Sequence, residues 1–203
     1  MTLLNATDIS CARGEQSLFE NLSFSLAAKQ CLHIRGANGS GKTSLLRILA
    51  GLLAPTAGEL RRQANTSFAY LAHKDGLKNE LSAIENMRFY QKLGSRETIP
   101  KKQSEDKLDH ALNALGLLNK ADKPTKSLSF GQRRRLAFAR LLLNEEKIWI
   151  LDEPLTGVDT HGRQLIEELC LNHLSYDGGI LISHHGDLST CSFANHVSTV
   201  DLS

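Results

Sequence analysis

Apolar and polar residues alternate near the N-terminus of this 203-residue chain. Leu22, Phe24 and Leu26 are separated by single serines, and this period of two is typical of a strand with one buried face. We therefore expect short strands separated by turns over residues 3–34. The last of them is the apolar-leaning stretch 31–34, which stands directly before a glycine-rich segment.

A helical pattern follows this segment, from residue 42 onward. Its apolar positions recur every three or four residues, as on one face of a helix, and we expect Leu52 or Leu53 to extend that buried face. Gly51, or the stretch 54–58 with its proline and glycine, is expected to end the helix in a turn. The other members of the buried face are Leu45, Leu46, Ile48 and Leu49.

The middle third of the chain is predicted to be helical. A strand is expected over 66–72, and helical periodicity then extends over about 81–143. Within it, the polar residues 94–106 are expected to form an exposed loop. The helices we expect are 83–90, 107–118 and 132–143.

Strand character returns in the last third, at 147–151 and 179–182, with a helix expected over about 162–174 between them. Both strands are apolar without alternation, as in a parallel sheet that is covered on its two faces. The chain is therefore expected to form one α/β domain with an all-helical insert. The boundaries we expect, within a single domain of residues 1–203, are about 1–77 and 145–203 for the core and about 78–144 for the helical subdomain.

The glycine-rich segment is a phosphate-binding motif. Residues 36–43 match G-x-x-x-x-G-K-[ST] at every defined position, between a predicted strand and a predicted helix. Its glycines let successive N–H groups point inward at phosphate oxygens, and Lys42 can reach the β- and γ-phosphates. The Thr43 hydroxyl is expected to bind Mg²⁺. The expected nucleotide-binding residues are Gly36, Ala37, Asn38, Gly39, Ser40, Gly41, Lys42, Thr43 and Ser44.

Two acidic residues follow the buried strand 147–151. Strand ends in parallel α/β sheets point at the ligand crevice, so these carboxylates are expected near the phosphates. Asp152 is placed to hold Mg²⁺, and Glu153 is placed to act as the general base that polarises the attacking water.

A further stretch, Leu128-Ser129-Phe130-Gly131-Gln132, points to a family. With the motifs at 36–43 and 148–153, it resembles the ABC ATPases, which carry an LSGGQ-like signature between these two motifs. The resemblance implies the fold class of a P-loop NTPase with a RecA-like core and a helical subdomain. It also implies that ATP bound to one chain is covered by the signature of a second chain, in a homodimer. The signature residues acting in this way would be Ser129, Phe130, Gly131 and Gln132, with Phe130 replacing the usual first glycine.

Histidines complete the predicted catalytic set. Ile182-Ser183-His184 matches the place where ABC proteins carry a histidine that contacts the γ-phosphate, so His184 is expected to act with Glu153. His185 is the adjacent alternative. Residues 155–159 match the loop that follows the motif 148–153 in the family.

Two positions depart from the usual ABC pattern. His73 stands where the family has a glutamine, and it can still contact metal-bound water. No aromatic residue stands near the N-terminus to stack on adenine, and Arg13 can stack there through its guanidinium plane instead. We expect weak selectivity for the base as a result.

The stretch 73–90 narrows the resemblance. Its histidine, the following Gly-Leu-Lys, and Glu-Asn-Met-Arg-Phe-Tyr are similar to the ATPase subunits of the bacterial cytochrome c maturation system, which act in haem export. The resemblance implies an ABC-type ATPase of the haem-transporting class, peripheral on the cytoplasmic face of the inner membrane. Its implied partners are an integral membrane permease and further haem-handling membrane subunits. The implied work is the release of a haem-loaded chaperone.

Composition and charge argue against several other classes of protein and site. A net charge of +2 gives no reason to expect nucleic acid as a partner, and the basic run 133–135 is expected to be a solvated helix face. No signal peptide is expected at the N-terminus, and no apolar run approaches the ~20 residues of a membrane helix. The four cysteines show no metal-binding or haem-attachment spacing, and we expect free buried thiols in a reducing cytosol.

Three other functions stay open at this stage. A generic ABC exporter or importer subunit is the nearest alternative. A soluble ABC ATPase acting on DNA or ribosomes usually has two ATPase halves or a long coiled coil, and this chain has neither. The intact motif residues argue against a non-catalytic subunit; these are Lys42, Asp152, Glu153 and His184.

Overall fold

The computed structural model describes residues 1–94 and 100–202, which divide into two units. The first, here called the sheet unit, comprises Met1–His73, Glu146–Pro154 and the chain from Glu168 onward. The second, here called the helical unit, comprises Lys74–Glu145 and Leu155–Glu167. Each unit is therefore assembled from stretches that are distant in sequence.

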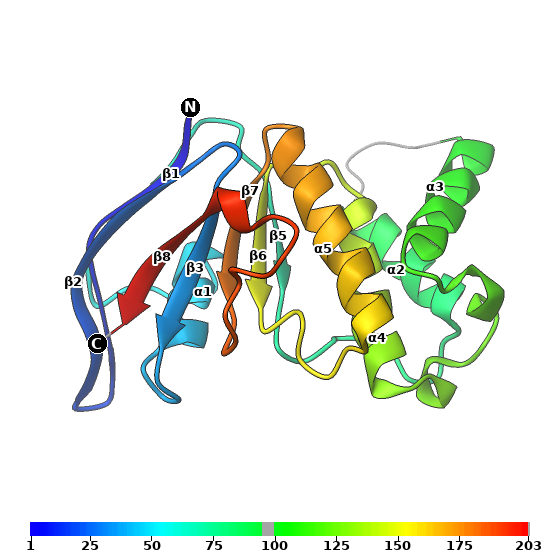
Figure 1. Ribbon diagram of the computed structural model, residues 1–203, viewed down its shortest axis with the longest axis horizontal. Helices are drawn as coiled ribbons and strands as arrows, with labels where there is room; N and C mark the ends of the chain where they lie inside the picture. The colour runs from blue at the N-terminus through cyan, green and yellow to red at the C-terminus, as the bar shows by residue number, and fades with distance from the viewer. Residues whose placement is uncertain (95–99, 203) are drawn as a thin grey trace. The chain divides into compact units, whose positions relative to one another are not determined.

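The sheet unit contains a three-stranded and a five-stranded sheet (Figure 1). The three-stranded sheet is antiparallel and has the order β2-β1-β4, whereas the strands of the other are parallel and have the order β5-β6-β7-β3-β8. The first sheet consists of β1 (Thr2–Arg13), β2 (Gln16–Ala27) and β4 (Ala57–Arg62). The second consists of β3 (Cys31–Gly36), β5 (Phe68–Leu71), β6 (Ile148–Asp152), β7 (Gly179–Ser183) and β8 (Val197–Leu202).

Burial along the strands follows the sequence pattern. In β2, Leu22, Phe24 and Leu26 are more buried than the serines between them, as the alternation predicted. All residues of β6 and β7 are buried, as expected for parallel strands covered on both faces. The expectation of short strands is wrong, because β1 and β2 are 12 residues long. Several shifts in their register let these strands bend without ending.

Helix α1 (Lys42–Leu49) fills the space above the parallel sheet, where it contacts β3, β6 and β7. Its four predicted leucine and isoleucine positions are buried in a core shared by both sheets. The predicted burial of Leu52 or Leu53 is wrong, since they are 65% and 41% exposed. The helix ends before them, and Gly51 at φ 68° turns the chain away from the helix face. The following turn is shorter than predicted, because β4 already starts at Ala57.

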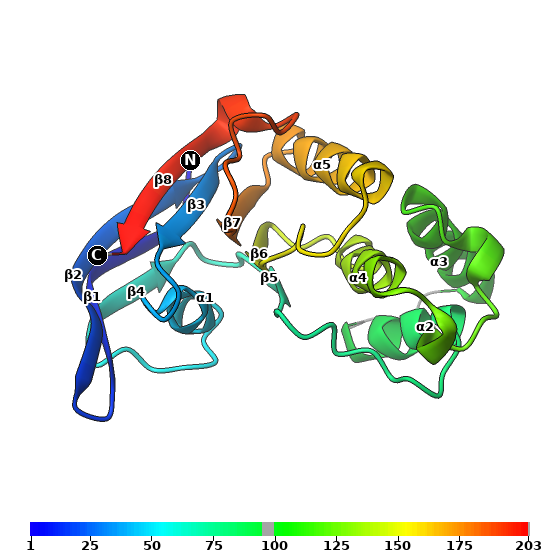
Figure 2. The same cartoon turned by 60° about the horizontal axis from the view of Figure 1, so that its bottom comes forward.

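The helical unit contains α2 (Ala83–Gly94), α3 (Lys101–Ala114) and α4 (Phe130–Ala139), which Figure 2 shows as a group. A fourth helix, α5 (Thr160–Ser175), begins in this unit and ends in the sheet unit. Three-residue 3₁₀ helices at Leu118–Lys120, Thr125–Ser127 and Arg140–Leu142 lie in this unit, and Ala194–His196 lies in the sheet unit. None of the helices within residues 1–94 and 100–202 combines the length and the apolar composition that spanning a bilayer requires.

The predicted bounds of the second helix are wrong. Helix α3 begins at Lys101, so residues 101–106 are helical rather than part of an exposed loop, and residues 95–99 of that predicted loop lie outside the described residues. The first turns of α3 are polar and largely exposed, so they carry no apolar period from which a helix could be predicted. Its buried residues begin at Leu108.

The arginine run of α4 is not the solvated face that we expected. Arg134 and Arg135 are buried, and Arg135 donates to the Leu115 carbonyl oxygen at 2.9 Å. Arg133 forms an ion pair with Asp75 at 2.8 Å. These contacts fasten α4 to the end of α3 and to the first residues of the helical unit.

All four cysteines are buried and none of them forms a disulfide, which agrees with the prediction of buried thiols. Burial raises the pKa of the Cys31 thiol and of the Cys11 thiol above the ordinary value. Both groups therefore stay protonated and behave as small apolar side chains.

Candidate functional site

The loop between β3 and α1 requires glycine at two positions. Gly39 and Gly41 have φ angles of 85° and 97°, in the left-handed region that other residues seldom adopt. A Cβ atom at Gly41 would also lie 3.0 Å from the ring of Phe19. The backbone can therefore curl at the start of α1, whose first N–H groups have no partner within the helix.

The Lys42 side chain folds back over this loop. Its Nζ donates to the carbonyl oxygens of Gly36 and Ala37, at 2.8 and 2.9 Å, and the side chain is almost fully buried. The ammonium group is thereby held at the loop by two carbonyl oxygens that a phosphate could replace as its partners. The charge is available to an anion without a large movement of the side chain.

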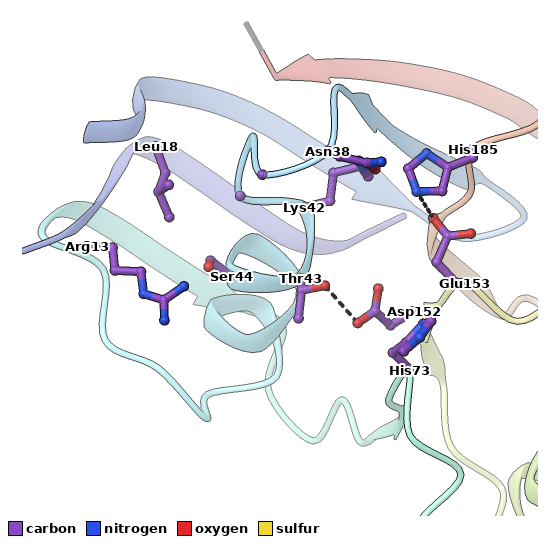
Figure 3. Close-up of a pocket in the computed structure, with 12 residues that line it drawn as sticks. Arg13, Leu18, Asn38, Lys42, Thr43, Ser44, His73, Asp152, Glu153 and His185 are labelled. Carbon is purple, nitrogen blue, oxygen red and sulfur yellow. Dashed lines mark hydrogen bonds and ion pairs between the residues drawn. The ribbon is translucent and has the colours of Figure 1, made fainter. Parts of the chain in front are cut away.

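A cavity of about 290 Å³ lies beside the loop (Figure 3). Most of the residues predicted to bind nucleotide line it, whereas Gly36, Ala37 and Ser40 are absent from its lining. Gly36 and Ala37 are the acceptors for Lys42, and the Ser40 hydroxyl is buried. The lining residues are Arg13, Leu18, Asn38, Gly39, Gly41, Lys42, Thr43, Ser44, His73, Asp152, Glu153 and His185.

Hydroxyl groups on both sides hold Asp152. Thr43 Oγ1 donates to Asp152 Oδ2 at 3.0 Å, and Ser183 Oγ donates to Asp152 Oδ1 at 2.7 Å. The carboxylate is buried at the end of β6, next to Ser183 on the neighbouring strand β7. A hydroxyl and a carboxylate in contact form part of the oxygen donor set that Mg²⁺ prefers, so these side chains fit that ion.

Glu153 is held in a strained conformation at the edge of the cavity. Its φ angle is 51°, which is uncommon for a residue other than glycine, and its N–H donates to both the carbonyl oxygen and the hydroxyl of Ser183 at 3.1 Å. The side chain is buried between His184 Nδ1 and His185 Nε2, each 3.4 Å from a different carboxylate oxygen. Strain of this kind is often found at functional positions.

The two histidines occupy different surroundings. Both histidines line a second, polar cavity of about 610 Å³ together with residues such as Arg35 and Asp201, but only His185 also lines the cavity beside the loop, as Figure 3 shows. The structure thus gives His184 its predicted contact with Glu153 but places the adjacent His185 on the first cavity. The His184 carbonyl oxygen lies 3.0 Å from Nε2 of His33, whose pKa is lowered by burial.

Arg13 and His73, the two departures from the usual pattern, both line the first cavity. In Figure 3, His73 lies beside Asp152, and Arg13 lies at the opposite end with Leu18. Among the residues that line this cavity, none is phenylalanine, tyrosine or tryptophan. A base bound there would meet a guanidinium group and an aliphatic side chain.

The predicted signature lies at the start of α4, in the helical unit. Ser129 caps the helix, since its hydroxyl accepts from the Gln132 N–H while the Gln132 side chain accepts from the Ser129 N–H. The N–H groups of Phe130 and Gly131, the first two helical residues, have no acceptor within the helix. This end of α4 therefore offers donors to an anion.

Two residues of the site were not predicted. Ser183 holds both acidic residues, and its only signal in the sequence was a hydroxyl residue at the end of an apolar strand. Leu18 lines the cavity from β2 and belongs to no motif.

The family model described as ABC transporter matches residues 19–156, about two thirds of the chain. The chain belongs to the ABC transporter family. The fold agrees, because a solved bacterial ABC transporter cassette, MJ0796, superimposes with a TM-score of 0.85. That comparison has 21% identity and covers 98% of this chain and 94% of the cassette.

Curated relatives place this ABC ATPase chain in a narrower group. A protein of Haemophilus ducreyi is 41% identical over 207 residues, which cover 96% of this chain and 93% of the relative. One of Vibrio vulnificus is 38% identical over 200 residues, which cover 94% and 95%. Both are named cytochrome c biogenesis ATP-binding export protein CcmA. Membership of the ABC family supports ATP binding and hydrolysis.

Replacing Ser183 by alanine is expected to destabilise this ABC ATPase chain by about 1–3 kcal/mol, because the buried partners of one hydroxyl lose their hydrogen bonds. The free energy of unfolding in urea measures the change. Ser175→Ala is the control, since its exposed hydroxyl bonds only within its own helix and a change within about 0.5 kcal/mol is expected. Equal effects of the two substitutions would contradict the role given to Ser183.

Proposed function

We propose that this chain is the ATP-hydrolysing subunit of a bacterial ABC transporter complex for c-type cytochrome biogenesis. The observation that carries the proposal is the identity of 37–42% to proteins with that name over at least 90% of the chain. The cavity that gathers Lys42, Thr43, Asp152 and Glu153 agrees with it. A subunit of another ABC exporter or importer is the alternative.

In the proposed reaction, the loop residues 38–44 bind the phosphates of ATP through backbone N–H groups. Lys42 exchanges its two carbonyl partners for phosphate oxygens, which keeps its charge satisfied in both states. Arg13 and Leu18 contact the base at the other end of the cavity. A guanidinium plane and an aliphatic group discriminate bases weakly, so GTP should compete with ATP.

Thr43 and Asp152 would hold Mg²⁺, with His73 contacting it through water. The ion would neutralise charge on the phosphates as they react. The residues of the chain have a separate task, which is to keep the Asp152 side chain aimed at the cavity. The hydrogen bonds from Thr43 and Ser183 accomplish this in the absence of any ligand.

Glu153 is the proposed general base. It accepts a proton from the water that attacks the terminal phosphorus, and its buried carboxylate is held in one orientation by the strained backbone. His184 supports it from the side away from the first cavity, and His185 supports it from within that cavity. In this arrangement His184 orients the base, while His185 also contacts the nucleotide.

The second half of the site comes from another copy of the chain. Ser129, Gly131 and Gln132 would cover the phosphates bound to the partner, with the unpaired N–H groups at the start of α4 as donors. Two copies related by a two-fold axis would form two such sites. The cassette MJ0796, whose fold this chain shares, was solved as a dimer.

Coupling of ATP hydrolysis to transport would require subunits that span the membrane. We propose an integral membrane permease and further haem-handling subunits, with this chain attached peripherally on the cytoplasmic face of the inner membrane. Closing of the ATPase dimer on ATP and opening after hydrolysis would release a haem-loaded chaperone on the far side.

Glu153→Gln is expected to lower kcat for ATP hydrolysis by a factor of 10² or more while ATP binding persists, because the amide cannot accept the proton. The variant should trap a dimer with ATP, which size-exclusion chromatography detects. Lys42→Ala is expected to lose ATP binding instead. Glu15→Gln, an exposed acid on the β1–β2 turn, is the control and should match the parent. Hydrolysis by Glu153→Gln at the parent rate would rule out Glu153 as the base.

Substitutions of His184 and His185 are expected to have different effects on kcat and KM. His184→Ala should lower kcat by about tenfold or more at an unchanged KM, because it contacts Glu153 but does not line the ATP cavity. His185→Ala should lower kcat and also raise KM, because it contacts Glu153 from within that cavity. A parent-like kcat for His184→Ala would contradict its orienting role.

In a strain that lacks this chain, c-type cytochromes should disappear from haem-stained gels and return with the parent gene but not with Glu153→Gln. The restored chain should be recovered in the membrane fraction and be released by alkaline carbonate, as a peripheral subunit is. Unchanged c-type cytochromes in the deletion strain would instead favour another ABC transporter. Recovery from the soluble fraction alone would contradict the proposed membrane partner.

A further inference from the structure

Phe130, in the signature stretch, is a large aromatic residue that is 65% exposed. It is the first residue of α4, where the capping box fixes the backbone of the turn. In the helical unit its ring lies against Gly157, which follows the motif 148–153 and precedes α5. The ring therefore covers a neighbouring loop while leaving one face open.

Position 157 favours glycine for two reasons. Its φ angle is 70°, and a Cβ atom built there would overlap Cε1 and Cδ1 of Phe130. A Cβ atom at Gly131 would lie 3.1 Å from the Gly157 carbonyl oxygen. Two consecutive residues of the signature turn thus rest on the backbone of Gly157.

The loop is also held on its other side. Asp159 Oδ1 accepts from the Gly162 N–H at 2.7 Å, a contact that caps the start of α5. A Cβ atom at Gly162 would lie 2.8 Å from Cδ of Arg135, the α4 arginine that donates to the Leu115 carbonyl oxygen. Residues 155–162 and the first turns of α4 are therefore packed as one body.

We propose that Phe130 and Gly157 form a steric pair that fixes residues 155–159 to the signature turn, so that both segments reach a second copy's nucleotide together. Phe130 is a positioning residue in this pair. Its aromatic ring contacts Gly157, whereas the glycine that is usual at position 130 would leave a gap there. The inference rests on the proposed function, because it assumes that the signature acts on ATP held by another copy. It adds that a bulky residue at position 130 requires glycine at 157.

The test is a double-mutant cycle on full-length protein with Phe130→Gly, Gly157→Ala and both together. Gly157→Ala is expected to lower kcat about tenfold, because the new methyl group displaces the ring and the signature turn. Phe130→Gly should lower kcat a few-fold at an unchanged KM for ATP. The double variant should recover several-fold relative to Gly157→Ala, because the overlap is gone and only the strain at φ 70° remains.

Tyr176→Gly is the matched control, since this aromatic residue is 80% exposed and lies outside the proposed site. It should leave kcat unchanged and should not rescue Gly157→Ala. If the effects of Phe130→Gly and Gly157→Ala on kcat simply multiply, the positioning role is wrong. Rescue of stability to urea without any rescue of kcat would also overturn it, because the pair would then be purely structural.

The same variants distinguish this inference from the proposed function. ATP hydrolysis by the parent, and trapping of a dimer by Glu153→Gln, establish the ATPase without reference to Phe130. A parent protein that does not hydrolyse ATP would contradict the proposed function. It would also contradict the role of the Phe130–Gly157 pair in catalysis. An active parent without coupling between positions 130 and 157 would overturn this inference alone.

Discussion

The carboxylate of Asp152 is the point on which the site depends. It accepts one hydrogen bond from Thr43 on α1 and another from Ser183 on β7, while its own backbone belongs to β6. Three elements from distant parts of the sequence are thereby held at one buried acid. Because an unsatisfied buried charge is costly, each of these contacts also favours the native arrangement of the others. The position of Glu153, the next residue, follows from this anchoring.

Much of the fold could be predicted because its signals are local. The glycine spacing of residues 36–43 encodes a backbone conformation directly, and the apolar runs of β6 and β7 encode burial on two faces. The acidic pair at the end of β6 could then be placed by topology alone, since parallel strands end at one edge. These parts of the site needed no information about side-chain packing.

The features that were missed depend on partners elsewhere in the chain. Burial of Arg135 requires the Leu115 carbonyl oxygen, and burial of the Ser183 hydroxyl requires the Asp152 carboxylate and the Glu153 N–H as its partners. The first turn of α3 is polar on every side, so periodicity could not reveal it. The choice between His184 and His185 depends on which of them also lines the cavity beside the phosphate-binding loop, and a sequence of two adjacent histidines cannot encode that difference.

The strand order has a consequence for synthesis of the chain. Among the described strands, β3, which leads into the phosphate-binding loop, pairs only with β7 and β8, and both of these follow residue 178. During translation the loop would emerge early, but the strands that pair with β3 would follow only when residues 179–202 left the ribosome. Pairings of such sequence separation form slowly. A chain that ends before these strands would thus expose apolar β3 rather than hold nucleotide, and binding competence would appear only after β7 and β8 have been synthesised.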